Sequence, residues 1–244
     1  MCRLMGYVAS KEVTFTELLG SELESFRALS SKHKDSWGIS ANSFGNLRTT
    51  KFVESAIESV AFPAIIAEHR ANGALLHLRE ASKGISVTPD NAHPFAMDDL
   101  SFIHNGTIFP HDALLGSIPE ELMEHRKGST DSELFFLMAV DRVRRSNLIE
   151  GVKSTIRELR DNFKYSGINS MFLDGRNLMV VCEFNEDDEH NQKTPGYYEL
   201  RFRADSEHLI VASSGWSQDG WILIPNHHAL IVDRKTLEFR VEEI

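Results

Sequence analysis

The chain of 244 residues opens with Met1-Cys2-Arg3-Leu4-Met5-Gly6-Tyr7-Val8-Ala9, the stretch around which we expect the fold to be organised. Its apolar run from Leu4 to Ala9 is typical of a buried strand, which would place Cys2 at the leading end of a central strand. If Met1 is removed, Cys2 carries a thiol with a reference pKa of about 8.5 and a free α-amine of about 7.7–8.0. Such a residue is a nucleophile with its own general base. The alternative interpretation is a small apolar residue at a frayed terminus.

The composition restricts the classes of function. The net charge of −10 argues against general binding of nucleic acid, which needs a basic surface. The sequence has no run of 18 apolar residues that would cross a membrane, and no apolar signal-peptide core. The two cysteines, Cys2 and Cys182, are too few for a disulfide scaffold. We therefore expect a cytoplasmic protein with a free Cys2 thiol and a buried, inert Cys182.

Periodicity predicts both helices and strands, without a repeat or a linker. Helices are expected at 14–30, 55–61, 111–115, 131–145 and 148–162. Strands are expected at 4–9, 37–41, 47–53, 73–79, 100–104, 167–173, 177–183, 197–202, 208–212, 221–224, 228–233 and 237–241. The segment 80–99 reads as a long irregular loop, and Asn105-Gly106 reads as a turn that stops the strand before it. This pattern favours an α+β fold of layers with mostly antiparallel sheets.

A nucleophilic Cys2 would need donors for an oxyanion and a grip on its substrate. Asn105 and Gly106 offer an amide side chain and an unhindered N–H, although a plain turn is the alternative. Arg79 ends an apolar strand and could clamp a carboxylate, or it is simply a surface arginine. Asp131 could accept an ammonium group, or it belongs to a helix cap. Together these groups describe a pocket for an α-amino acid with an acyl side chain, such as glutamine or a γ-glutamyl amide.

Six sequence blocks carry a resemblance to a known family. They are Met1-Cys2-Arg3, Asp35-Ser36-Trp37-Gly38-Ile39, His77-Leu78-Arg79-Glu80-Ala81-Ser82, Asn91-Ala92-His93-Pro94-Phe95, Phe102-Ile103-His104-Asn105-Gly106 and Thr130-Asp131-Ser132-Glu133. In this order they resemble the class II glutamine amidotransferases. More narrowly, they are similar to the stand-alone members that hydrolyse γ-glutamyl bonds in ergothioneine synthesis and glutathione breakdown.

The resemblance implies a fold and a set of roles. The fold would be the four-layer αββα sandwich of the N-terminal nucleophile hydrolases, as a single domain over residues 1–244 whose mature chain starts at Cys2. Cys2 would attack a γ-amide and form a γ-glutamyl thioester, with Asn105 and Gly106 stabilising the oxyanion. The residues expected to bind substrate are Arg79, Asp131, Ser82 and His104. No cofactor is implied, and His77, His93 and His104 lack the spacing of a metal site.

The sequence also departs from the family. In the larger, synthase-linked enzymes the arginine is followed by tryptophan and Ala-Thr-His-Gly, where this chain has Glu80, Ser82, Lys83 and Gly84. This departure leaves open whether glutamine itself is the substrate. No acceptor domain is expected after residue 244, which favours a hydrolase. The alternatives are a glutaminase subunit that delivers ammonia to a separate synthase partner, or a silent module that binds γ-glutamyl ligands.

Overall fold

The computed structural model describes residues 2–244 and contains two sheets in which every strand pairing is antiparallel. Sheet A has the order β11 (Ile222–Ile224), β9 (Leu200–Ala204), β10 (His208–Ser213), β1 (Arg3–Val13), β4 (Ala71–Arg79), β2 (Ser36–Ser43), β3 (Asn46–Phe52). Sheet B has the order β13 (Phe239–Glu243), β12 (His228–Asp233), β8 (Asn177–Cys182), β7 (Lys164–Leu173), β6 (Leu100–Phe109), β5 (Phe95–Met97). The predicted removal of Met1 concerns a residue outside the described range.

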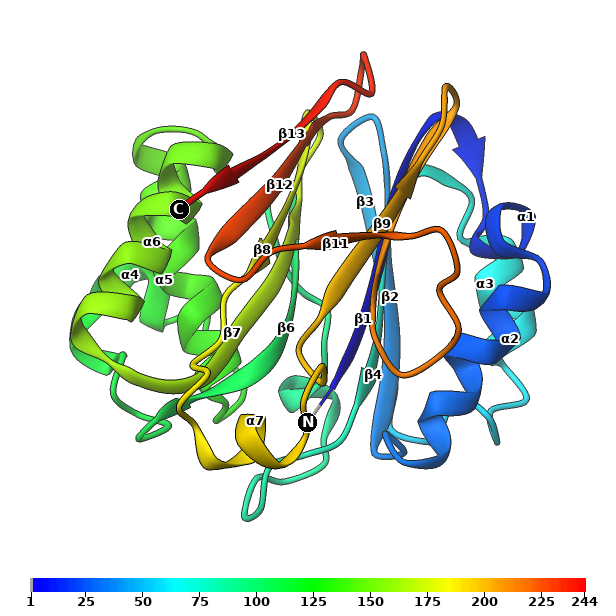
Figure 1. Cartoon of the computed structure of the whole chain (residues 1–244). Coiled ribbons are helices and arrows are strands. Elements are labelled where there is room, and N and C mark those ends of the chain that lie inside the picture. The colour runs from blue at the N-terminus through cyan, green and yellow to red at the C-terminus, as the bar shows by residue number, and fades with distance from the viewer. Residues whose placement is uncertain (1) are drawn as a thin grey trace.

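Helices cover the outer face of each sheet (Figure 1). Those beside sheet A are α1 (Phe15–Leu19), α2 (Ser21–Ala28) and α3 (Phe62–Glu68), with the 3-10 turn η1 (Leu29–Ser31). Those beside sheet B are α4 (Glu120–Met123), α5 (Asp131–Arg145) and α6 (Leu148–Asn162). The remaining short elements are η2 (Pro89–Asn91), η3 (Leu115–Ser117) and α7 (Glu189–Lys193). The order is therefore helices, sheet, sheet, helices, which confirms the predicted αββα layers. Within the described range no helix is both long and apolar enough to cross a membrane.

The alternation of β1 explains why this strand lies in the middle of sheet A. Leu4 and Val8 belong to the apolar cluster between the two sheets, whereas Met5 and Tyr7 belong to the cluster under α1 to α3. Because both faces of β1 are buried, it pairs with β10 on one side and β4 on the other. The predicted position of Cys2 at the start of a central strand is confirmed.

Several predicted elements are wrong or displaced. The helix expected at 14–30 is divided at Gly20, whose φ of 53° ends α1. The helix expected at 55–61 lies instead at Phe62–Glu68. The helix expected at 111–115 is absent, because 111–114 form turns and Leu115 begins η3. The strand expected to stop at Asn105 continues as β6 to Phe109. Continuous pairing with β7 overrides the local turn signal there, because Asn105 lies opposite Asn169 in the middle of the sheet.

Candidate active site

Cys2 lies at the start of β1 with its side chain half-buried. Its Sγ is 4.0 Å from the carbonyl oxygen of Glu80. Burial raises the pKa of the Cys2 thiol above its usual value. The thiol is therefore protonated at neutral pH and needs a base to become a nucleophile.

Asn105 on β6 provides the closest polar contact to Cys2. Its Oδ1 accepts a hydrogen bond of 2.8 Å from the backbone nitrogen of Cys2. The side chain is 1% exposed, and its Nδ2 has no hydrogen-bond partner among residues 2–244. Since Oδ1 faces a donor, the amide orientation is fixed and Nδ2 is left as a buried donor beside the thiol. Such a donor is rare in a folded protein unless it serves a ligand.

Gly106 follows on the same strand, where only glycine fits. A Cβ at this position would lie 1.7 Å from the carbonyl oxygen of Gly167 on β7. A side chain would therefore force β6 and β7 apart and displace Asn105 as well. The sequence signal Asn-Gly marks a close approach of two strands here, not a turn.

Arg79 is the last residue of β4 and lies next to the start of β1, since its neighbour Leu78 pairs with Arg3. Its side chain is 4% exposed, so it is not the surface arginine of the alternative interpretation. Within the described part of the chain, its Nη1 has no hydrogen-bond partner. Burial lowers the pKa of Arg79, while the nearby charges of Cys2, Asp35 and Asp131 oppose that shift. A buried guanidinium with an unused donor can hold a carboxylate.

Asp131 is the first residue of α5, and its carboxylate is not used to cap the helix. The cap is Thr130, whose hydroxyl accepts from the backbone of Glu133 at 3.1 Å. Asp131 Oδ2 accepts from the backbone nitrogen of Ile108 at 2.7 Å, and Oδ1 lies 3.8 Å from His111 Nδ1. The nearby negative charge of the Asp131 carboxylate raises the pKa of His111. One carboxylate oxygen is thus held in place, and the other has only a distant partner.

The predicted residues converge on one small cavity of about 30 Å³. Those that line it are Cys2, Arg79, Ser82, His104, Gly106 and Asp131. Asn105 joins them through its bond to Cys2. The two ring nitrogens of His104 already face Ser132 Oγ at 2.8 Å and the Gly167 carbonyl at 3.4 Å. His104 therefore shapes the wall of the cavity and connects it to α5, whereas Ser82 contributes from the loop after β4.

The sequence did not single out Arg3 as a site residue. The guanidinium of Arg3 lies 3.9 Å from the centre of the Tyr197 ring and donates to the Tyr197 carbonyl at 2.9 Å. Arg3 is buried, with 6% exposed. Arg3 therefore connects the start of β1 to a segment that lies 194 residues later in the chain. The sequence signal that could have identified Arg3 was its position as a charged residue at the beginning of an apolar strand.

The histidines of this region do not form a metal centre. His77 and His93 stack with ring centres 4.2 Å apart, and burial lowers the pKa of both well below the usual value. Over residues 2–244, no group of three or more His, Cys, Asp or Glu side chains is placed to hold a metal ion. Cys182 is buried between the sheets, and burial raises the pKa of its thiol to about 12.

Comparison with known proteins identifies the family. The sequence pattern of the family described as "Glutamine amidotransferases class-II" matches residues 1–219. The chain belongs to the class II glutamine amidotransferases. Members of this family are enzymes that hydrolyse the amide of glutamine or transfer its ammonia. The family resemblance predicted from the six sequence blocks is confirmed.

Relatives of this amidotransferase include longer enzymes. Glutamine–fructose-6-phosphate aminotransferase of Vibrio vulnificus is 29% identical over 165 residues, which cover 65% of this chain and 25% of the relative. A probable glutamine amidotransferase of Saccharomyces cerevisiae is 23% identical over 204 residues, which cover 66% of this chain and 57% of the relative. The chain thus spans a quarter of the length of the first of these relatives.

Solved structures show the same fold. A class II glutamine aminotransferase domain protein from Silicibacter pomeroyi has a TM-score of 0.69 at 18% identity, covering 100% of this chain and 99% of the other. Glutamine phosphoribosylpyrophosphate amidotransferase from B. subtilis has a TM-score of 0.68 at 16% identity, covering 99% of this chain and 49% of the other. The amidotransferase therefore shares its fold with these two proteins.

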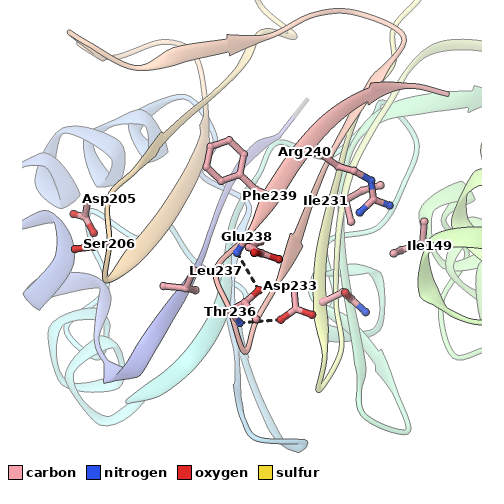
Figure 2. A pocket seen from close by; sticks show the side chains of 11 residues that line it. Ile149, Asp205, Ser206, Ile231, Asp233, Thr236, Leu237, Glu238, Phe239 and Arg240 are labelled. Atoms are coloured by element: carbon pink, nitrogen blue, oxygen red, sulfur yellow. Dashed lines mark hydrogen bonds between the residues drawn. The ribbon is translucent and has the colours of Figure 1, made fainter.

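A larger hollow of the amidotransferase, about 780 Å³, shares no lining residue with the Cys2 cavity (Figure 2). It is bounded by Asp205 and Ser206 on one side and by the hairpin of β12 and β13 on the other. Among the described residues that line it there is no cysteine, histidine or lysine. We therefore place the candidate chemistry in the smaller cavity, because reactive groups rather than volume define an active site.

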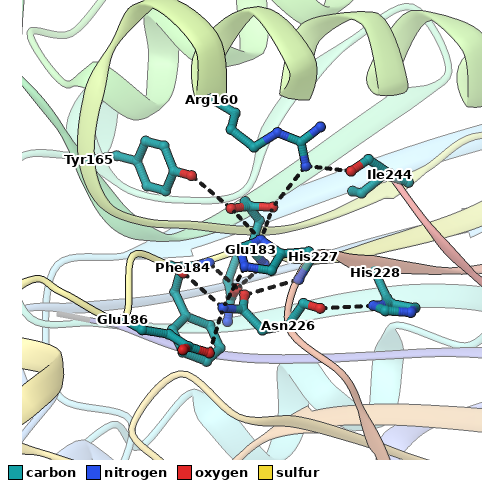
Figure 3. Close-up of polar contacts among 10 residues, drawn as sticks. Arg160, Tyr165, Glu183, Phe184, Glu186, Asn226, His227, His228 and Ile244 are labelled. Carbon is teal, nitrogen blue, oxygen red and sulfur yellow. Dashed lines mark hydrogen bonds and ion pairs between the residues drawn. The ribbon is translucent and has the colours of Figure 1, made fainter.

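A second buried carboxylate, that of Glu183, lies near Arg160 of α6 (Figure 3). Glu183 is fully buried and accepts a bond of 2.7 Å from the Tyr165 hydroxyl. His227 Nδ1 lies 3.0 Å from both of its oxygens, and Arg160 lies 3.8 Å from Oε2. We call these four residues the Glu183 cluster. Each of its carboxylate oxygens has partners within the protein.

Proposed function

We propose that this chain hydrolyses the γ-amide of glutamine or of a γ-glutamyl compound, with the Cys2 thiol as nucleophile. The observation that carries the proposal is the bond from the Cys2 nitrogen to Asn105 Oδ1, with Nδ2 left as an unpartnered donor among residues 2–244. In this arrangement Asn105 Oδ1 would hold the α-amine of Cys2 beside the thiol once Met1 is removed. The arrangement also supports a donor that is ready for an oxyanion at the same place.

The first step forms a thioester. The Cys2 thiol gives its proton to the α-amine of the same residue, and Sγ attacks the γ-carbonyl carbon. Asn105 Nδ2 and the Gly106 N–H stabilise the oxyanion. The C–N bond then breaks, and the α-amine returns the proton to the leaving nitrogen. Ammonia or an amine departs, and the glutamyl group remains on sulfur.

The second step regenerates the enzyme. Water attacks the thioester carbonyl with the α-amine as general base, the C–S bond breaks, and the sulfur recovers a proton as glutamate leaves. Arg79 holds the substrate α-carboxylate and Asp131 holds its α-ammonium throughout. Ser82 and His104 complete the wall around the glutamyl group. The proposal treats residues 2–244 as one domain.

The second candidate is a glutaminase that delivers ammonia to a separate synthase. It is favoured by the fructose-6-phosphate aminotransferase relatives, of which this chain matches a quarter. A stoichiometric assay separates the two candidates. A hydrolase releases one free ammonia or amine for each glutamate, whereas a dedicated subunit releases little ammonia until its synthase is added. A silent γ-glutamyl-binding module would release neither product.

Two measurements test the nucleophile directly. Intact-mass spectrometry should show a chain that begins at Cys2, because a retained Met1 blocks the α-amine and defeats the mechanism. A diazoketone analogue of glutamine should add one label to the wild type and to Cys182→Ala, but none to Cys2→Ala. Equal labelling of Cys2→Ala and the wild type would sink the assignment of Cys2.

A further inference from the structure

A second hollow lies directly beside the catalytic cavity. We call it the outer groove, and it is lined among others by Glu80, Thr107, Phe109, Asp188, His190 and Tyr197. Its volume is about 430 Å³, against about 30 Å³ for the catalytic cavity. Glu80 lines both hollows. The outer groove is therefore reached from Cys2 without crossing either sheet.

Three contacts place the outer groove on the leaving-group side of Cys2. The carbonyl oxygen of Glu80 is 4.0 Å from Sγ, and Thr107 directly follows Gly106 on β6. The ring of Tyr197 packs on Arg3, the residue after Cys2. Arg79 and Asp131, by contrast, line only the catalytic cavity, which would hold the glutamyl half. A bond broken at Cys2 would thus have its acyl half in the small cavity and its amine half in the outer groove.

The outer groove contains polar atoms that the protein does not use. Across residues 2–244, neither the Tyr197 hydroxyl nor His190 Nε2 has a hydrogen-bond partner. Tyr197 is only 9% exposed, and the two rings meet edge to face at 5.3 Å. Buried polar groups without a partner are rare in folded proteins. Two residues of the groove wall thus carry unused polar atoms, and the volume of about 430 Å³ leaves room for a ligand that is larger than ammonia.

The charged residues that line the outer groove indicate the sign of the charge that a ligand there would carry. Glu80, Asp188 and Glu189 line it together with a single lysine, Lys32. Burial lowers the pKa of His190, so this ring is neutral at pH 7 and does not offset the carboxylates. Phe109 is 45% exposed and adds an aromatic ring to the lining, whereas the Tyr197 ring is already covered by the guanidinium of Arg3. The excess of carboxylates over the one lysine favours a cation over an anion.

We propose that the outer groove binds the amine half of a γ-glutamyl amide, and that this amine carries a positive charge away from the scissile nitrogen. The inference rests on the proposed function of Cys2 and adds the class of its substrate. The free amine would leave with its charged end still facing Glu80 and Asp188. Water would then take its place for hydrolysis of the thioester.

The test uses γ-glutamyl anilides that differ only in charge. The para substituents are aminomethyl (cationic), hydrogen (neutral) and carboxylate (anionic), with glutamine as the reference. In each case water cleaves the C–N bond and yields glutamate and the free aniline. We expect kcat/KM for the cationic anilide to exceed that of the anionic one by about tenfold or more, the effect of two or three partly screened charges. Equal values, or a preference for the anion, would overturn the inference.

Variants of the groove charges sharpen the test. Asp188→Asn with Glu189→Gln removes two charges, and the amide oxygen introduced in place of the Asp188 carboxylate would still cap α7. The preference for the cation should fall to about twofold or less. Glu189→Gln alone changes only an exposed side chain, which also pairs with Lys193, and should lower the preference partway. The matched control is Asp187→Asn, which removes a charge from an exposed residue outside the groove and should keep the full preference.

The two proposals fail in different ways. If glutamine is hydrolysed and Cys2 is labelled, but the three anilides react alike, the outer groove does not select a cation and the proposed function stands. If no substrate releases glutamate and the diazoketone does not label Cys2, both proposals fall. If Asp187→Asn lowers the preference as much as the groove variants do, the selection comes from overall charge and the groove is not its source.

Discussion

The Cys2 cavity and the Glu183 cluster are two separate buried polar regions, and they differ in how completely their atoms are paired. In the Glu183 cluster, Tyr165, His227 and Arg160 surround both carboxylate oxygens. In the Cys2 cavity, Asn105 Nδ2 and Arg79 Nη1 have no partner within residues 2–244. Burial of polar groups is common to both regions, so it does not by itself mark an active site. Unused hydrogen-bonding capacity distinguishes them, because a ligand can supply the missing partners.

The largest expected effect is that of Asn105→Ala. Loss of one oxyanion donor should lower kcat for glutamine by about 10²–10³ with little change in KM. The free energy of unfolding should change much less than the activity, since Nδ2 has no partner to lose among the described residues. Steady-state kinetics with urea unfolding checks both values. A change confined to KM would show that Asn105 binds the ground state instead.

Asp131→Asn should act on binding. The substituted side chain keeps an oxygen for the Ile108 N–H, so the helix terminus stays in place. Loss of the charge should raise KM for glutamine by about 10–10², the usual value of a charge-assisted hydrogen bond. Alpha-keto analogues that lack the ammonium group give the control, because they should not distinguish the variant from the wild type. A variant that loses kcat at unchanged KM would contradict the role in binding.

Glu183→Gln should have the opposite effect, a loss of stability with little change in activity. It removes a charge that is fully paired, so the free energy of unfolding should fall by about 1–3 kcal/mol. The kcat/KM for glutamine should stay within about twofold, since none of the four residues of the cluster lines the Cys2 cavity. Urea unfolding and glutaminase assays on the same preparation test the contrast. If activity falls while stability is retained, the two regions are coupled and the distinction between them is broken.

The smallest expected effect concerns His111 and pH. The nearby Asp131 carboxylate raises the pKa of His111 in the folded protein above that of the unfolded chain. The stabilisation is therefore fully present below about pH 6.5 and is lost as pH rises through the folded pKa. The free energy of unfolding of His111→Asn should fall below that of the wild type at pH 5 and match it at pH 8. Because the side chain is 33% exposed, the difference should be at most about 0.5 kcal/mol.

The fold was predictable where the sequence periodicity was regular. The predicted bounds of α5 and α6 agree with the structure, because both helices present an apolar face and begin at a capping side chain. Prediction failed at Gly20, which divides a helix, and at Asn105-Gly106, which continues a strand. Gly20 was given no weight in the predicted helix, whereas Asn105-Gly106 was recognised as a special backbone position but interpreted as a turn. The meaning of Asn105-Gly106 depended on its pairing with β7, which is distant in the sequence.

The sequence by itself determined the nature of the reactive groups. Cys2 after the initiator, a charged Arg79 at the end of an apolar run, and Asn105, Gly106 and Asp131 in order indicate the chemistry, because side-chain type and strand position are local properties. Only the tertiary structure decided which polar atoms stay unpaired, and therefore which are available to a substrate. It also placed Tyr197 and His190 together in the wall of the outer groove, with Tyr197 packed on Arg3, the residue after Cys2. Pairing and proximity depend on how two sheets pack, which no stretch of the chain specifies alone.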